Sequence, residues 1–323
     1  MLNLENDYKN YNCNSLTIKN IGEKVYLQGW VKAKRDHGEL VFIDLYDFYG
    51  MTQLTCENTN VNLINSIKNL PRESVIAIQG KVVKRSENSK NIKIITGEIE
   101  IAIESMEILN KSLRLPFELH ESNTVNEEIC FQYRFLQLRG GLNQIMYLRS
   151  NIVFQIRQFM HSKNFIEVET PILTGPSEEG ARDFVVPSRL HKGKFYALPQ
   201  APQIFKQLTM VGGLPKYYQI AKCFRDEDLR RDRSLEFTQL DIEIAFATKD
   251  QIFAYIEELM QLVFKLPNKS FRRIQYNDAM NLYGTDKPDL RNPLILQDIT
   301  DLLLTSGLNM FVNNIKDNKA VAK

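Results

Sequence analysis

Between residues 23 and 108, apolar and polar positions alternate in short runs, which is the pattern of β-strands with one face in a core. The runs read "VYLQGWV", "LVFIDLYD", "MTQLTC", "SVIAIQGKVV" and "EIEIAIESMEI", with turn signals at Tyr49-Gly50 and Thr96-Gly97. One helical segment, "NLINSIKNL", separates the third run from the fourth. Five strands with a helix in this place predict a small Greek-key β-barrel.

The period changes after this region. The segment "GLNQIMYLRSNIVFQIRQFM" has apolar side chains three or four residues apart, at Ile145, Leu148, Ile152, Ile156 and Phe159. This spacing predicts an amphipathic helix, and "DQIFAYIEELMQLVFKL" predicts another after residue 250. Between them lie the predicted strands "KFYAL", "KYYQIAKCF" and "FTQLDIEIAF", whose order favours an antiparallel sheet over alternating parallel units.

The chain is therefore predicted to have two parts of different class. An N-terminal β-barrel of the OB-fold type takes residues 1–110, and a hinge takes residues 111–140. An α+β domain built on an antiparallel sheet begins at residue 141.

Composition narrows the class of protein. The 323 residues are 43% hydrophobic and 25% charged, which suits a soluble globular chain of about two domains. The formal net charge of +2 excludes a generally basic coat, so a polyanion would have to meet local clusters. Four widely spaced cysteines without a CxxC pair indicate neither zinc nor a disulfide framework and fit a reducing cytoplasm. We expect no membrane span, no export signal and no metal ligands.

The stretch "FRDEDLRRDRSLEFTQLDIEIAF" combines dense charge with a regular strand. Leu240, Ile242, Ile244 and Phe246 are predicted on one face, and Gln239, Asp241 and Glu243 on the other. The preceding strand delivers Arg225, so the whole predicts an antiparallel hairpin with a long polar loop. The simpler interpretation is a solvated loop. A rigid sheet that holds an arginine and carboxylates is, however, a good scaffold for an anionic substrate.

This stretch resembles the second signature motif of the class II aminoacyl-tRNA synthetases, in the version of the bacterial-type aspartyl-tRNA synthetases. Further segments resemble the same family in the same order. "FIEVETPIL" resembles the first class II motif, "EGARDFVVPSR" and "FYALPQAPQIFKQL" resemble aspartate-binding segments, and "YGTDKPDLRNP" is typical of the family. "GWVKAKRDHGELVFIDLYDFYGMTQL" is similar to its anticodon-binding barrel. The resemblance covers nearly the whole chain.

The resemblance implies a cytoplasmic, homodimeric aspartate–tRNA ligase that uses ATP and Mg²⁺. Such an enzyme activates L-aspartate to aspartyl-adenylate and transfers it to the 3′ end of tRNA(Asp). It implies a catalytic Arg225 on the α-phosphate and the substrate carboxylate, where a fixed bidentate donor lowers the barrier. The ATP-binding residues carried over are Arg225, Asp226, Glu227, Ser234 and Phe237. Ser234 departs from the glutamine that many relatives carry, which puts a side-chain contact there in doubt.

The aspartate-binding residues carried over are Glu179, Gln203, Lys206, Arg225 and Asp241. Gln203 and Lys206, three apart after Pro202, would project from one face of a helix. The resemblance assigns Lys206 to the substrate side chain, in an ion pair with Asp241. The anticodon residues carried over are Arg35, His37, Phe42 and Gln53. His37 stands where relatives that also charge tRNA(Asn) often carry histidine, so charging of tRNA(Asn) as well is an expectation.

The third class II motif, with its ATP-binding arginine, is not in the sequence. Residues 141–294 would hold motifs 1 and 2 of a catalytic domain, and residues 295–323 resemble the start of the insertion domain of bacterial-type members. The alternative function is a truncated, catalytically inactive tRNA-binding paralogue or fragment. A class II ligase for lysine or asparagine is a further alternative, against which "RDEDLR" and "EGARDF" argue.

Overall fold

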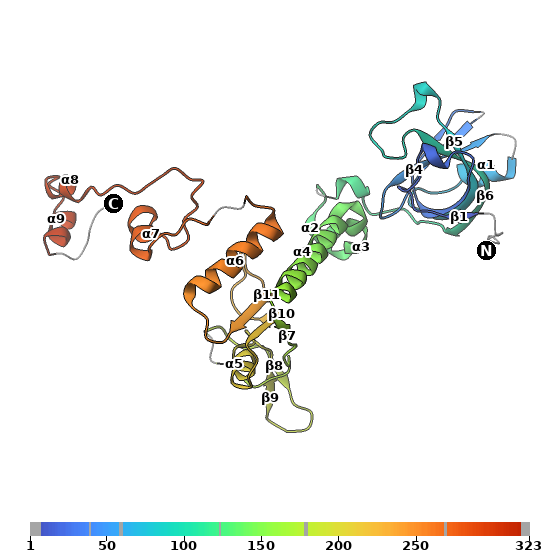
Figure 1. The fold of residues 1–323 in the computed structure, drawn as a ribbon. Helices are drawn as coiled ribbons and strands as arrows, with labels where there is room; N and C mark the ends of the chain where they lie inside the picture. Colours follow the sequence, from blue (N-terminus) through green and yellow to red (C-terminus); the bar gives the residue numbers. More distant parts are fainter. Residues whose placement is uncertain are drawn as a thin grey trace. The chain divides into compact units, whose positions relative to one another are not determined.

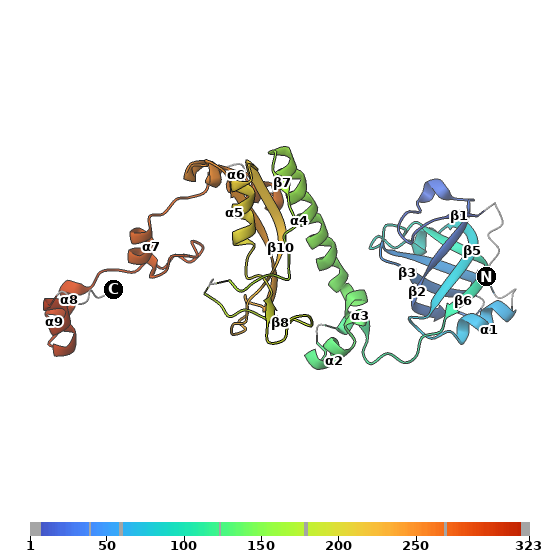
Figure 2. The ribbon, with the colours of Figure 1, turned by 90° about the horizontal axis from the view of Figure 1, so that it is seen from below.

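A computed structural model describes residues 8–38, 40–57, 61–122, 124–177, 180–267 and 270–317 of the chain. The chain divides into two compact units, residues 1–143 and 144–323. Figures 1 and 2 show the elements of each unit from two directions.

The first unit is a closed β-barrel. Its sheet has the order β1-β2-β3-β4-β6-β5, and an additional pairing of β2 with β5 closes it. The strands are β1 (Lys9–Asn10), β2 (Lys24–Asp36), β3 (Leu40–Tyr46), β4 (Met51–Glu57), β5 (Val75–Lys84) and β6 (Ile99–Asn110). Helix α1 (Val61–Lys68) lies between β4 and β5 in the chain. The predicted OB-fold is therefore confirmed, and only the short β1, parallel to β2, was not expected.

Alternation along the strands builds the barrel core. Val41, Ile43 and Leu45 of β3 are almost completely buried, as the pattern predicts, and they join Leu27 and Leu54 in one cluster. Phe42 and Gln53 lie half-buried on the other face of their strands. Because side chains of a strand alternate between its faces, the buried set leaves a row of polar and aromatic groups on the outside of the barrel.

Short helical elements complete the first unit. These are η1 (Ile18–Asn20), η2 (Glu87–Ser89), η3 (Leu119–Glu121), α2 (Glu127–Gln132), α3 (Arg134–Gln137) and the π-helical turn η4 (Leu138–Leu142). Arg139 of η4 lies over the Trp30 ring at 4.7 Å and pairs with the buried carboxylate of Glu73. The segment that follows β6 is thus fastened to the barrel by a cation–π contact and an ion pair.

The second unit contains a small mixed sheet with the order β11-β10-β7. Strands β10 (Lys216–Phe224) and β11 (Glu236–Ile244) are antiparallel, and β7 (Ile166–Glu167) runs parallel to β10. A separate ribbon joins β8 (Val185–Pro187) to β9 (Phe195–Ala197). The helices are α4 (Asn143–Ser162), α5 (Gln203–Val211), α6 (Lys249–Phe264), α7 (Tyr276–Tyr283), α8 (Thr300–Leu304) and α9 (Asn309–Lys316). The predicted α+β class is confirmed.

One face of the sheet packs against α4 and α6. The buried cluster consists of Phe159, Met160, Phe165, Tyr218 and Leu259, and the partly buried residues that pack on it include Ile156, Leu240, Ile242 and Ile244. Ile145 and Leu148 are instead exposed, because the cluster takes only residues from the second half of α4.

Phe246 corrects the predicted core face of the hairpin. It is fully exposed and has a positive φ of 56°. Strand β11 ends at Ile244 because its last partner in the ladder is Lys216, the first residue of β10. Beyond that pair the chain turns away, so the alternation stops.

Candidate functional site

The β10–β11 hairpin carries a polar face opposite the core face. The register pairs Gln219 with Asp241 and Cys223 with Phe237, so these four side chains share that face. Residues 225–235 connect the two strands. The predicted long-looped hairpin is therefore present, with Arg225 at the point where β10 ends.

Lys206 and Asp241 form the central ion pair of this face. The Lys206 Nζ lies 2.9 Å from Asp241 Oδ1 and 3.4 Å from Glu243 Oε2, and the Lys206 and Asp241 side chains are only 11% exposed. Lys206 is one turn into α5, which contacts both β10 and β11. Gln203 is the first residue of that helix and is half-buried, so it lies one turn from Lys206.

Arg225 lies against the ring of Phe237. Its guanidinium carbon is 5.1 Å from the ring centroid, and its backbone N–H donates to the Leu235 carbonyl at 2.9 Å. The buried Nε of Arg225 finds no hydrogen-bond partner among the described residues, and the same holds for Oδ2 of Asp241. Both atoms are buried polar groups on the polar side of the hairpin whose hydrogen bonds the described residues do not supply.

The loop between the strands holds the other predicted nucleotide contacts. The backbone N–H of Asp226 donates to the Arg182 carbonyl at 3.1 Å, which forms an isolated β-bridge between the two residues. Glu227 lies 3.7 Å from Arg233, and the Ser234 hydroxyl donates to the Glu236 carbonyl at 2.8 Å. The Ser234 side chain is thus engaged with its own loop.

Glu179 lies outside the described residues. The chain that follows it is held by Gln200, a fully buried side chain that the sequence did not single out. The Ala181 N–H donates to Gln200 Oε1 at 3.2 Å, and Gln200 Nε2 donates to the Ala181 carbonyl at 2.9 Å and to Asp183. No local pattern distinguishes Gln200 from a surface glutamine, because its partners are far away in the sequence.

The barrel brings the four predicted anticodon residues together on one surface. Arg35 makes a bidentate pair with Asp44, with both N–O distances 2.7 Å, and its guanidinium reaches Gln53 at 3.5 Å. The ring of His37 meets the ring of Phe42 edge-on, at 5.5 Å between centroids. The register pairs Arg35 with Phe42 and Asp44 with Gln53 across three adjacent strands.

Asp44 and Glu100 complete this polar surface, and the buried Arg85 interacts electrostatically with both. All three were missed. Gln53 Nε2 donates to Glu100 at 3.1 Å, and Arg85 Nε donates to the Ile99 carbonyl at 2.7 Å. Burial raises the pKa of Glu100 and lowers that of Arg85, whereas the hydrogen bond to Asp44 raises the pKa of Arg35. The strand alternation places Asp44 on the same face as Phe42, so that signal was in the sequence.

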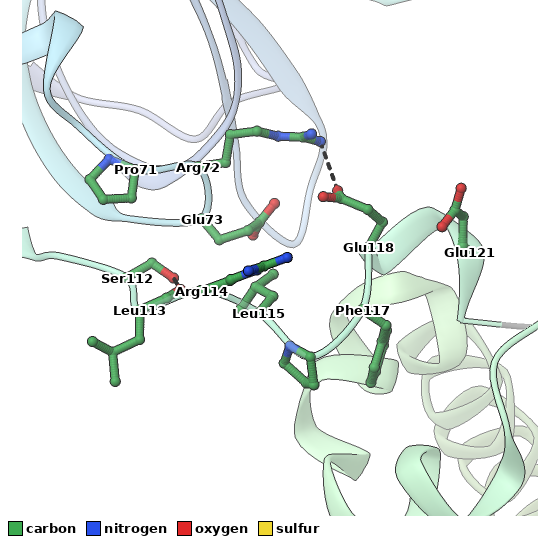
Figure 3. A pocket seen from close by; sticks show the side chains of 11 residues that line it. Pro71, Arg72, Glu73, Ser112, Leu113, Arg114, Leu115, Phe117, Glu118 and Glu121 are labelled. Carbon is green, nitrogen blue, oxygen red and sulfur yellow. Dashed lines mark hydrogen bonds and ion pairs between the residues drawn. The ribbon is translucent and has the colours of Figure 1, made fainter.

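A separate hollow of about 600 Å³ lies in the first unit, between the turn Pro71–Glu73 and residues 112–121. Arg72 and Glu118 meet across it at 3.2 Å (Figure 3). None of the predicted site residues lines it. In the described part of the chain, no three His, Cys, Asp or Glu side chains are grouped to hold a metal, and no helix is long and apolar enough to cross a membrane.

Comparison with known proteins gives two family matches. Residues 126–318 match the family described as tRNA synthetases class II (D, K and N), and residues 25–109 match the OB-fold nucleic acid binding domain.

Curated relatives are similar over nearly the whole chain. The aspartate–tRNA(Asp/Asn) ligase of Anaplasma marginale is 47% identical over 326 residues, which cover 98% of this chain and 55% of the relative. That of Rickettsia canadensis is 48% identical over 322 residues, covering 97% of this chain and 54% of the relative. The chain spans about half the length of the curated relatives it matches.

Solved structures support the fold. The asparaginyl-tRNA synthetase of Pyrococcus horikoshii with asparaginyl-adenylate superposes with a TM-score of 0.69 at 24% identity, over 79% of this chain and 58% of that one. A putative aspartyl-tRNA synthetase from Leishmania major gives a TM-score of 0.71 at 21% identity, over 82% and 54%.

Proposed function

Since the chain belongs to the class II tRNA synthetases of the D, K and N group, we propose that it acts in aspartate–tRNA ligation. In the first step the L-aspartate carboxylate attacks the α-phosphate of ATP, which forms aspartyl-adenylate and releases pyrophosphate. In the second step the aspartyl group passes to the 3′ end of tRNA and AMP is released. The observation that carries the proposal is that two buried polar atoms on the polar face of the hairpin, Arg225 Nε and Asp241 Oδ2, have no partner among the described residues. Asp241 also pairs with Lys206 of α5.

The residues of the hairpin fit a nucleotide. Arg225 is fixed by its backbone and by the Phe237 ring, so its free Nε can donate to an α-phosphate oxygen with little loss of side-chain entropy. The exposed part of the Phe237 ring suits stacking of adenine, and Asp226, Glu227 and Ser234 supply polar groups on the same loop. ATP supplies the adenylyl group. Arg225 offsets the negative charge that builds up during attack by the aspartate carboxylate.

Lys206 is the residue proposed to select aspartate. Its ammonium is held in place by Asp241 and Glu243, so it presents a fixed positive charge to a carboxylate side chain. A carboxylate accepts a charge-assisted hydrogen bond from the ammonium, whereas a neutral carboxamide accepts only a weaker one, so the carboxamide analogue binds less tightly. Gln203, one turn earlier on α5, and Glu179 are proposed to bind the backbone groups of the substrate.

The barrel is proposed to bind the tRNA anticodon. Phe42 and His37 offer rings for stacking, and Arg35, Gln53 and Glu100 offer donors and acceptors for base edges. The relatives named above are ligases for both tRNA(Asp) and tRNA(Asn), and on that likeness with His37 we propose both as substrates.

The proposal also covers the oligomeric state, the cellular compartment and the metal ion. Exposed apolar side chains along α4, including Ile145, Leu148 and Phe154, support a homodimer in which this helix packs on a second copy. All four cysteines are buried thiols that form no disulfide, which suits a reducing cytoplasm. Mg²⁺ is proposed only by family likeness, since the described residues do not group as metal ligands.

The experiment is a calorimetric titration of the chain with non-hydrolysable analogues of aspartyl-adenylate and asparaginyl-adenylate. The proposal expects the aspartyl analogue to bind at least tenfold more tightly, because Lys206 meets a carboxylate in one and a carboxamide in the other. Equal affinity for the two analogues would contradict the assignment of Lys206, and binding of neither would contradict the proposed site.

A further inference from the structure

Residues 184–225 are a continuous stretch without a single Asp or Glu, and they contain seven Lys and Arg residues. The net charge of the whole chain is only +2, so this stretch is a local concentration of positive charge. It covers β8, β9, α5 and β10 of the second unit. A local basic surface on a nearly neutral protein usually has an acidic or polyanionic partner.

Four of the seven cations are engaged within the fold. Lys206 pairs with Asp241, Lys222 pairs with Glu236, and Arg225 lies over the Phe237 ring. Lys216 donates to the Tyr255 hydroxyl and to the Lys163 carbonyl.

The other three cations gather in the loop between β8 and β9. Arg189, Lys192 and Lys194 are exposed, and across the described ranges of the chain none of their charged groups contacts a carboxylate. Three cations within six residues repel one another, so the fold gains nothing from their proximity unless a polyanion binds there.

The loop is nevertheless ordered by its own hydrogen bonds. The Ser188 N–H donates to the Lys194 carbonyl at 2.9 Å, and the Lys194 N–H donates to the His191 carbonyl at 3.1 Å. The Ser188 hydroxyl accepts from the His191 N–H at 3.1 Å. Gly193 has a φ of 76°, which a type II turn requires at its third residue. The three cations therefore project from a turn of fixed shape rather than from a random coil.

Aromatic rings lie beside these cations. Phe195 and Tyr196 begin β9 directly after Lys194, and they are 56% and 39% exposed. Cations that alternate with exposed rings suit a nucleic acid, because phosphates pair with the cations and bases stack on the rings. An acidic protein surface would use the charges but would not need the rings.

We propose that the β8–β9 hairpin binds the phosphate backbone of tRNA through Arg189, Lys192 and Lys194. This contact is additional to the barrel, and the inference rests on the proposed function, which makes tRNA a substrate. It predicts binding that is insensitive to tRNA sequence and sensitive to salt, because phosphates carry no base identity.

The test compares two triple variants of the full chain. One is Arg189→Glu with Lys192→Glu and Lys194→Glu. The matched control is Lys249→Glu with Arg272→Glu and Lys316→Glu, which changes the net charge equally at three exposed residues of the same unit. Affinity for unmodified tRNA(Asp) is measured between about 50 and 200 mM salt, since each lost phosphate contact reduces the slope of log affinity against log salt by roughly 0.7–0.9.

The inference expects the hairpin variant to bind at least tenfold more weakly than the control at the lowest salt, with a slope smaller by about 2 to 3. The same loss with an unrelated tRNA supports a backbone contact. Equal effects of the two triple variants, or an unchanged slope, would overturn it.

Two further outcomes have separate meanings. If the unmodified chain binds no tRNA, both the proposed function and this inference are wrong. If the hairpin variant binds tRNA normally and changes only the sedimentation of the chain, the loop contacts a second copy and the inference is wrong. The single substitution Lys192→Gln, expected to reduce the slope by about 1, tests the same contact if the triple variant misfolds.

Discussion

The Lys206 ammonium lies 2.9 Å from Asp241 on the polar face of the hairpin, with both side chains largely buried. Lys222, on the opposite face of the same hairpin, lies 2.9 Å from Glu236, but these side chains are 52% and 56% exposed. The two pairs have the same length and differ in burial, so they provide a matched comparison.

Lys206→Met leaves Asp241 buried without a cation, and we expect the free energy of unfolding of the second unit to fall by about 3 kcal/mol. Lys222→Met should lower it by less than about 1 kcal/mol, because water screens an exposed pair. Chemical denaturation followed by far-UV circular dichroism measures both. Similar losses for the two variants would show that burial of the Lys206 pair does not matter.

Arg225→Lys should weaken binding of the aspartyl-adenylate analogue by about a hundredfold, because lysine keeps the charge but loses the planar fork and the free Nε. The control is Arg230→Lys, an exposed residue of the same loop, which should leave the affinity within about twofold. Calorimetry measures both affinities. An unchanged affinity in Arg225→Lys would remove the guanidinium from the phosphate site.

Phe42→Ala should weaken tRNA binding by roughly 1–3 kcal/mol, the usual contribution of one stacked base. Phe48→Ala removes another aromatic ring of the barrel, one that packs edge-on against Tyr49, and should have little effect. Filter binding at fixed salt compares the two. A larger effect at Phe48 than at Phe42 would place the anticodon elsewhere on the barrel.

Glu100 gives the barrel a pH dependence. Burial raises its pKa above the ordinary 4.5, so the folded barrel holds this proton more tightly than the unfolded chain. As pH rises from 4.5 through the raised pKa, the folded state must place a charge in a poorly solvated position, and this lowers the free energy of unfolding. The variant Glu100→Gln has no carboxyl group at this position, so its free energy of unfolding does not fall for this reason.

The stability of Glu100→Gln relative to the unmodified chain should therefore increase between pH 4.5 and pH 7. Trp30, the only tryptophan of the chain, lies in β2 and reports unfolding of the barrel by its fluorescence in urea. A difference in stability that stays constant or decreases over this range would show that Glu100 carries no burial cost.

Local alternation predicted the barrel well because each strand records its buried face in its own sequence. Val41, Ile43 and Leu45 are an example, since nothing beyond β3 is needed to assign them. The same rule failed at Phe246, because the end of β11 depends on where β10 begins. A strand needs a neighbouring strand for its hydrogen bonds, and the sequence of one strand does not show where its neighbour begins or ends.

Some residues of the candidate site could be predicted from the sequence and others could not. Family motifs led to Arg225, Lys206 and Asp241, and the structure brings all three to the one hairpin. Gln200 could not be predicted, because its role depends on hydrogen bonds to Ala181 and Asp183, across a loop whose path no local pattern specifies. Burial of a polar side chain is a property of the whole fold.

The central claim is that Arg225 at the hairpin and Lys206 of α5 are contacts for aspartyl-adenylate. A crystal structure of the chain with the non-hydrolysable aspartyl analogue measures this directly. The account predicts that Arg225 Nε lies within about 3 Å of an oxygen of the phosphate mimic, and that Lys206 lies within ion-pair distance of the ligand carboxylate. A ligand bound away from the hairpin, or one that leaves Arg225 Nε without a partner, would contradict it.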